Sequence, residues 1–340
     1  MKWLKRIAAA LALLVLVLAV VLVIGARRGE NPVGQQVARV ETPDGPVAVA
    51  IWYPTTARAW PTTLIGAQLL EVAKDGPVKG DGLPLVVLSH GNSGAAFSHT
   101  DLALALASAG YVVMAPTHAG DNYADTSRQG SPALFSQRAA QLRATVDFAL
   151  EGWKDAGRID ATRVGAFGFS AGGFTVLTLA GGHPDMAAIP THCQQSPEFI
   201  CDVLRATKSP LVDGPDGAGD FLPDPRLRAA VVAAPGLGFT FANGGLADVA
   251  IPVQVWSGEK DEAVPYETNA AVVEHELAGR AESHRIAGAG HLSFLPPCGL
   301  IGPPALCRDG EGFDRAAAHE AMNASVLAFF EKAMPKGGVR

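Results

Sequence analysis

The pattern of hydrophobic and polar positions divides the chain into an N-terminal apolar run and a longer region of short, alternating elements. Residues 7–26 carry no charged side chain, and as a helix rising about 1.5 Å per residue they would span about 30 Å, the thickness of a bilayer's hydrocarbon core. More basic residues precede the run than follow it, which favours a cytoplasmic N terminus and an exported remainder. We therefore expect residues 1–28 to be a signal anchor or a signal peptide.

Two processing routes are open for this segment. The apolar run is longer than the roughly 7–15 residues of a typical signal-peptide core, which favours a retained anchor. The small residues Gly25 and Ala26 are compatible with cleavage. The first route gives a membrane-anchored protein facing the extracytoplasmic side, and the second gives a secreted or periplasmic one.

Beyond the anchor, short apolar runs alternate with segments that have apolar residues at helical spacing. Strands are expected at 47–53, 85–89, 111–115, 164–169, 229–234, 251–257 and 283–287, and helices at 98–110, 142–153, 172–180, 266–277 and 313–332. Short apolar strands separated by helices indicate an α/β fold, with a mostly parallel sheet covered by helices on both faces. We expect one catalytic domain over residues 29–340.

Two stretches, 55–82 and 183–225, break the alternation, since they are rich in Pro and Gly and poor in periodicity. We expect both to be irregular insertions. Segments of this length in a compact domain are usually lids or binding loops, or else disordered. They either cap the mouth of a site, with Phe199 and Phe221 as substrate-binding wall residues, or decorate the surface.

Composition and charge narrow the function classes. A hydrophobic content of 48% excludes a disordered polypeptide, and four cysteines in 340 residues are too few for a disulfide-stapled miniprotein. Residues 1–28 hold five of the 27 basic side chains and no acidic one, which leaves 22 basic against 33 acidic side chains, a net charge of −11. Nucleic acid is therefore a poor partner for the folded part. The sequence does not indicate an oligomeric state.

The segment 168–172 reads Gly-Phe-Ser-Ala-Gly and matches the pattern G-x-S-x-G between a predicted strand and a predicted helix. In such a sharp turn, glycine at both flanking positions avoids a clash of Cβ with neighbouring backbone, and the Ser170 hydroxyl is presented at the carboxyl end of the strand. The alternative is the glycine-rich turn of a nucleotide-binding fold, but the segment lacks the G-x-G-x-x-G pattern. Ser170 is the expected nucleophile.

A serine nucleophile needs a base that takes its proton and a carboxylate that orients the base. His291 follows a predicted strand near the end of the domain and is the expected base. Asp261 lies on a loop at the carboxyl end of the preceding strand and is the expected acid, with Glu259 and Glu262 as rivals. The order Ser, Asp, His along the chain is the one expected for an α/β-hydrolase.

The oxyanion of a tetrahedral intermediate needs preorganised N–H donors. One expected donor is the backbone N–H of Ala171, because the first amides of a helix have no partner within the helix. The second should come from the loop 90–94 (HGNSG), and the Asn92 N–H is our choice, with His90 bracing the loop. His118 and Asp121, after the next strand, are expected either to contact substrate or to hold their own loop by hydrogen bonds.

The four cysteines fall in two irregular segments. An even number of cysteines in an exported chain permits disulfides, and three connectivities are possible. We expect the local pairs Cys193–Cys201 and Cys298–Cys307, while free thiols in a cytosolic domain are the alternative. Neither a Cys-x-x-Cys nor a His-x-x-x-His spacing occurs, so no metal is expected.

Four segments carry a resemblance to the α/β-hydrolase superfamily that extends over residues 35–335. They are SHGNSG (89–94), GFSAGG (168–173), SGEKDEAVP (257–265) and GAGHLSF (288–294), and they look similar to dienelactone-hydrolase-like proteins and to relatives of platelet-activating-factor acetylhydrolase. The resemblance implies hydrolysis of carboxylic esters without a cofactor or metal, and the acetylhydrolase likeness suggests short acyl chains on a lipid-like leaving group. True dienelactone hydrolases have a cysteine nucleophile where this chain has Ser170, so lactone specificity is not carried over.

Taken together, the sequence predicts an exported serine hydrolase that cleaves small-molecule or lipid-like carboxylic esters through a Ser-His-Asp triad and an acyl-enzyme. A peptidase or acyltransferase on the same fold is the first alternative, and cleavage of amides or acyl transfer to an added alcohol would reveal it. A non-catalytic binding module is the second alternative, and an incomplete triad would reveal that one.

Overall fold

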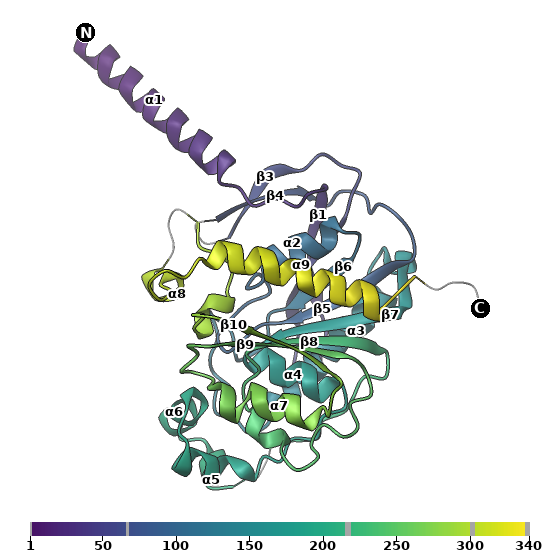
Figure 1. The fold of residues 1–340 in the computed structure, drawn as a ribbon. Coiled ribbons are helices and arrows are strands. Elements are labelled where there is room, and N and C mark those ends of the chain that lie inside the picture. The colour runs from purple at the N-terminus through teal and green to yellow at the C-terminus, as the bar shows by residue number, and fades with distance from the viewer. Residues whose placement is uncertain (1, 66–67, 215–218, 300–302, 337–340) are drawn as a thin grey trace.

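The computed structural model describes residues 2–65, 68–214, 219–299 and 303–336, and in these segments ten strands form one sheet (Figure 1). The strands are β1 (Val33–Val40), β2 (Val47–Pro54), β3 (Trp60–Ile65), β4 (Gln68–Lys74), β5 (Leu83–Ser89), β6 (Val112–Pro116), β7 (Ile159–Phe169), β8 (Leu227–Ala233), β9 (Val253–Gly258) and β10 (Ala281–Ile286). Their order in the sheet is β10-β9-β8-β7-β5-β6-β2-β1-β4-β3. The strands from β10 to β6 are all parallel, and β2 runs antiparallel to both β6 and β1.

Helices cover both faces of this sheet, which is the arrangement that the sequence pattern predicts (Figure 1). They are α1 (Lys2–Ile24), α2 (Thr100–Ser108), α3 (Leu134–Asp147), α4 (Ala171–Leu179), α5 (Ala188–Gln195), α6 (Phe199–Ala206), α7 (Ala270–Glu276), α8 (Pro304–Cys307) and α9 (Arg315–Ala333). The apolar side chains of α2 and α9 pack in one core cluster, and those of α3, α4 and α7 pack in the other. The central strands are buried because they lie between two helical layers.

The helix α1 extends away from the domain (Figure 1). It is long and apolar enough to cross a membrane by length and composition, and none of its window Lys2–Val21 is buried. Soon after the helix ends, the N–H of Arg27 donates to the Leu69 carbonyl at 2.9 Å, and the Arg27 carbonyl accepts from Glu71 at 2.8 Å. Only two residues therefore separate α1 from Arg27, the first residue that bonds to strand β4.

The stretch 55–82 is not the irregular insertion that its composition suggests. It contains β3 and β4, which extend the sheet at the edge farthest from β10. Leu70 and Val72 are buried while Glu71 between them is partly exposed, which is the two-residue alternation of a strand with one covered face. The strands β2 and β1 separate this segment from the central strands, so it does not cap the carboxyl end of β7.

The stretch 183–225 is also more regular than expected. It contains the helices α5 and α6, and its residues 215–218 lie outside the described residues. A disulfide between Cys193 of α5 and Cys201 of α6 joins the two helices, and a second one joins Cys298 to Cys307. Both local pairs are those expected from the sequence.

Candidate active site

Ser170 lies in a sharp turn between β7 and α4 and has a φ of +55°. This left-handed backbone conformation is rare for a residue with a side chain, and it often marks a functional site. A Cβ on Gly168 would collide with the carbonyl of Gly172, and a Cβ on Gly172 would collide with the carbonyl of Ser89. Both glycines are therefore required for the turn that presents the Ser170 side chain at the end of the central strands.

Of the three side chains expected to form a triad, His291 lies within hydrogen-bond distance of both Ser170 and Asp261. His291 Nε2 is 2.9 Å from the Ser170 Oγ, and His291 Nδ1 is 2.7 Å from Asp261 Oδ2. Asp261 Oδ1 also accepts from the backbone N–H groups of Ala263 and Val264, which fixes the carboxylate. The rival residues Glu259 and Glu262 are exposed, and the carboxylate next to the imidazole is that of Asp261.

A second set of contacts supports the loop that carries His291. Ser293 Oγ accepts from the N–H of Gly290 at 3.0 Å and donates to Asp309 at 2.6 Å. The Ser293 carbonyl accepts from Nε2 of His319 at 2.9 Å, and Nδ1 of His319 lies 2.6 Å from Asp101. The loop is therefore tied to α2 and α9, the helices on one face of the sheet.

The loop after β5 lies directly against the nucleophile. A Cβ on Gly91 would lie 3.3 Å from the Cβ of Ser170 and 2.9 Å from the ring of Phe169. Asn92 and Ala171, the two expected oxyanion donors, line the same pocket as Ser170. Within the described part of the chain, neither backbone N–H donates a hydrogen bond, so both are available to a ligand.

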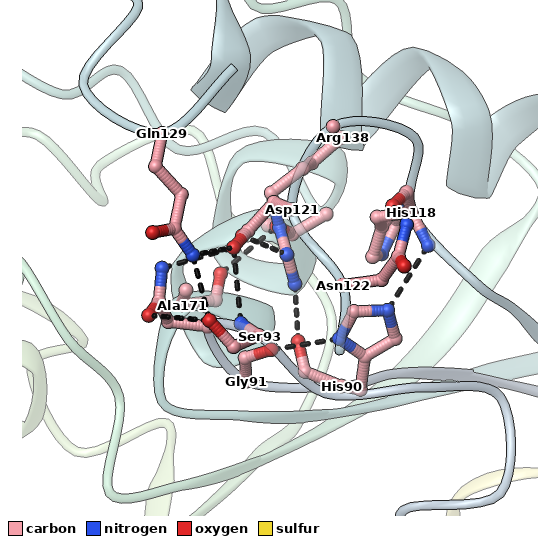
Figure 2. Close-up of polar contacts among 12 residues, drawn as sticks. His90, Gly91, Ser93, His118, Asp121, Asn122, Gln129, Arg138 and Ala171 are labelled. Carbon is pink, nitrogen blue, oxygen red and sulfur yellow. Dashed lines mark hydrogen bonds and ion pairs between the residues drawn. The ribbon is translucent and has the colours of Figure 1, made fainter. Parts of the chain in front are cut away.

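A buried ion pair holds this loop in place (Figure 2). Arg138 Nη1 lies 2.6 Å from Asp121 Oδ2, with the two side chains 0% and 1% exposed, and Nη2 of Arg138 donates to the His90 carbonyl. Asp121 Oδ1 accepts from the Ser93 N–H and from the Gln129 amide, each at 3.0 Å. Burial opposes the charge on Asp121, but the guanidinium and these hydrogen bonds lower the pKa of its carboxyl below the ordinary value.

Two buried histidines complete the network, and their partners define their tautomers. Gln141 Oε1 is an acceptor 3.0 Å from His118 Nδ1, which leaves His118 Nε2 to accept from the Ser89 hydroxyl at 2.9 Å. His90 Nδ1 donates to the Gly91 carbonyl at 2.7 Å, and its Nε2 accepts from the His118 N–H at 3.0 Å. Burial and the nearby guanidinium lower the pKa of His118, and the same causes lower the pKa of His90 to about 3. Both rings are therefore neutral at neutral pH.

The pocket beside Ser170 is mostly apolar, and α6 forms one of its walls. Phe199 lines the pocket, as expected from the sequence, together with Val203 and Leu204 of the same helix. Phe221 and His118 are absent from the lining formed by the described residues. Phe221 instead packs on Phe174 of α4, with ring centroids 5.7 Å apart, and His118 is fully buried in the network below the loop.

Glu198 also lines the pocket, although the sequence patterns did not single it out. It precedes α6 and its Oε2 accepts from Thr268 at 3.0 Å and from Asn269 at 2.9 Å. Burial raises the pKa of the Glu198 carboxyl to about 7. An acidic residue immediately before a short amphipathic helix is the signal that could have drawn attention to it.

No cluster of three or more His, Cys, Asp or Glu side chains suited to a metal ion occurs among the residues that the structure describes. The groups around Ser170 are a hydroxyl, an imidazole, a carboxylate and free N–H groups. Such a set supports nucleophilic acyl transfer by its own side chains.

Comparisons with known proteins concern the family and the fold of the chain. Residues 72–211 match the Dienelactone hydrolase family, a range that contains Ser170 and Asn92 but neither Asp261 nor His291. The chain is 29% identical over 247 residues to NocK of Nocardia uniformis subsp. tsuyamanensis, named as a candidate esterase, covering 66% of this chain and 68% of that protein. A ferulic acid esterase from Streptomyces cinnamoneus has the same fold, with a TM-score of 0.60 and 20% identity over 92% of this chain and 96% of its own. The chain therefore has the fold of this esterase, and its residues 72–211 are similar to the dienelactone hydrolase family.

Proposed function

We propose that the chain is a serine esterase that cleaves carboxylic esters with short acyl groups, using Ser170, His291 and Asp261 as its triad. The observation that carries the proposal is the continuous set of short contacts from the Ser170 hydroxyl through the imidazole to the carboxylate, 2.9 and 2.7 Å long. This is the arrangement in which a neutral imidazole removes the proton of a serine as the serine attacks.

In the proposed reaction, Ser170 Oγ attacks the carbonyl carbon of the ester while its proton moves to His291 Nε2. Asp261 accepts a hydrogen bond from Nδ1–H, which keeps the lone pair of Nε2 directed at the hydroxyl. The imidazolium then gives the proton to the leaving alcohol, and an acyl-enzyme remains. Water activated by His291 attacks the acyl-enzyme, which releases the carboxylic acid and restores the hydroxyl.

The backbone N–H groups of Asn92 and Ala171 are the proposed oxyanion donors. Both lie in the pocket wall beside Ser170, and neither has an acceptor in the part of the chain that the structure covers. The Ala171 N–H also begins α4, where the partial positive charge of the helix end favours an anion. Removing one such donor from an acyl-transfer enzyme typically raises the barrier by about 2.7–4 kcal/mol.

The size of the pocket favours short acyl groups. Its interior volume is about 40 Å³. Ligand pockets typically have volumes of roughly 300–1,000 Å³, so an interior this small favours a short acyl group. A longer chain would have to extend past the exposed side chain of Phe199 at the rim.

We also propose that the protein acts outside the cytoplasm, as one catalytic domain behind an N-terminal anchor or a cleaved signal peptide. The exposed apolar helix α1 and the two disulfides support this location, because disulfides persist mainly in oxidising compartments. Small-molecule or lipid-like esters are the proposed substrates.

The first test is the variant Ser170→Ala. Turnover of p-nitrophenyl acetate should fall by at least about 10⁴-fold, and labelling by an organophosphonate probe should disappear, because the attacking oxygen is gone. The control is Ser196→Ala, which removes an exposed hydroxyl near α5 and should change neither readout. Labelling of Ser170→Ala at the rate of the unaltered protein would contradict the proposal.

A further inference from the structure

Two buried carboxyl groups that the proposed reaction does not use line the pocket beside Ser170: Asp121 is paired with the Arg138 guanidinium, and Glu198 is not. The rest of the wall near Glu198 is apolar and includes Phe199, Ile200 and Val264. Glu198 is only 6% exposed, in contrast to Asp202 one turn further along α6, whose side chain is 80% exposed. An ionisable group is costly to bury in an apolar site, and such groups are concentrated at functional sites.

The contacts of Glu198 use only one of its two carboxyl oxygens. Oε2 accepts from the hydroxyl of Thr268 and from the side-chain amide of Asn269, and it lies 3.4 Å from Nε2 of His192. Oε1 has no hydrogen-bond partner among the residues described, although it belongs to a side chain of the pocket wall. These contacts hold the carboxyl group in position and leave one oxygen for a ligand.

We propose that Glu198 determines substrate specificity, and that its carboxylate favours esters bearing a positively charged group near the reacting carbonyl over neutral esters of the same shape. The inference rests on the proposed esterase function, because it concerns the pocket in which Ser170 would act. A carboxylate surrounded by apolar side chains attracts a cation more strongly than the same group would in water, because the effective dielectric is lower. The net charge of −11 on residues 29–340 also attracts a positively charged substrate.

The charge on Glu198 should depend on pH in the neutral range, which gives the inference a second readout. Burial raises the pKa of the carboxyl to about 7, and the hydrogen bonds from Asn269 and Thr268 oppose this. The other titratable groups that face it are His192 of α5 and the proposed triad members Asp261 and His291. The carboxyl is ionised above its pKa, so the preference for a cation should be present at pH 8 and lost at pH 6.

The experiment compares two acetate esters of nearly identical shape, acetylcholine and 3,3-dimethylbutyl acetate, which differ by one positive charge. The readout is the ratio of their kcat/KM values in the full-length protein, so that any effect of pH on the shared acyl-transfer step cancels. In Glu198→Gln the ratio should fall roughly 15- to 35-fold at pH 8, the size expected for two charges about 8–10 Å apart at an effective dielectric constant near 20. The ratio of the unaltered protein should rise from pH 6 to pH 8, and that of the variant should stay flat.

Two further variants sharpen the test. Asp202→Asn removes a charge from the exposed side of the same helix and should leave the ratio within about twofold, since exposed charges are screened. Glu198→Asp retains the charge and should retain most of the cation preference, which separates loss of charge from loss of packing. An unchanged ratio in a Glu198→Gln protein that still hydrolyses the neutral ester would overturn the inference, whereas failure of the unaltered protein to hydrolyse either ester would count against the proposed function instead.

Discussion

The two loops that face Ser170 are held by different kinds of contact. The loop after β5, which carries Asn92, is tied down by the ion pair of Arg138 and Asp121, and both side chains are almost completely buried. The loop after β10 carries His291, whose side chain is 13% exposed and close to solvent. One loop is thus held by a fully buried ion pair, whereas the other is held by hydrogen bonds of Ser293 to Asp309 and His319, and its imidazole lies closer to solvent.

This difference corresponds to the two tasks of the proposed reaction. N–H donors stabilise an oxyanion best when they are already in place, so that no reorganisation is needed during the reaction. A permanently charged pair and two neutral histidines provide such a fixed support at neutral pH. A base has to gain and lose a proton in every cycle, and proximity to solvent makes exchange of that proton possible.

The largest effect is expected on the histidine side, from Asp261→Asn. An asparagine can present its N–H₂ to Nδ1, which places the imidazole proton on Nε2 and prevents that atom from accepting the proton of Ser170. We expect kcat for p-nitrophenyl acetate to fall about 10⁴-fold, with little change in the thermal unfolding midpoint. Steady-state kinetics and thermal unfolding of the purified variant measure the two effects.

The control for this variant is Glu262→Gln, which neutralises the neighbouring, exposed carboxylate. Its kcat should equal that of the unaltered protein. If Asp261→Asn kept a tenth or more of the original kcat, the carboxylate 2.7 Å from the imidazole would not have the proposed role.

On the other side of Ser170, Arg138→Met should affect both stability and activity. The substitution leaves Asp121 buried without its partner, and breaking a buried pair in this way typically costs about 3–5 kcal/mol of unfolding free energy. It also removes the donor to the His90 carbonyl, so the loop of Asn92 should lose its fixed position and kcat should fall. Denaturant unfolding and steady-state kinetics of the same preparation test both expectations.

Two comparisons make this prediction specific. The double variant Arg138→Met with Asp121→Asn should be more stable than Arg138→Met alone, because no buried charge remains unpaired. Arg158→Met, which breaks the exposed pair with Asp81, should cost no more than about 1 kcal/mol. Equal losses for Arg138→Met and Arg158→Met would show that burial of the first pair has no energetic consequence.

Much of the fold and part of the site could be predicted because the relevant signals are local. Apolar runs such as Leu85–Ser89 can be recognised as buried strands, and parallel strands place their carboxyl ends at one edge of the sheet. Residues that directly follow such strands, including Ser170, Asp261 and His291, were therefore expected to lie close together. The structure brings these three together, and their roles stay a prediction.

The features that were missed depend on contacts between distant segments. Arg138 and Asp121 are 17 residues apart on different elements, and no short motif contains both. A charged residue on the apolar face that includes Leu134 and Leu142 is an indirect signal of a buried partner. The stretch 55–82 was misjudged because its Pro and Gly content outweighed the short alternation around Leu70. The composition of the whole stretch hides a short local pattern. A few residues that alternate between apolar and polar are enough for a strand to pair with a sheet.

The smallest expected effect is a pH dependence of stability that should differ between the two loops. Unfolded histidine has a pKa of about 6.5, whereas the pKa of buried His118 is lowered, so the unfolded chain binds more protons below pH 6.5. The stability contribution of neutral His118 is therefore present above pH 6.5 and is lost as the pH falls, by at most about 2 kcal/mol between pH 6.5 and 5. His118→Gln should reduce the pH dependence of the unfolding free energy by about that amount, while the exposed His275 changed to Gln should leave it unaltered.

The same protonation should also be visible in amide hydrogen exchange. Protonation of His118 at Nε2 ends the hydrogen bond from Ser89, so acid should increase exchange in the loop of Asn92 at a higher pH than in the loop of His291. The opposite order would contradict the comparison of the two loops.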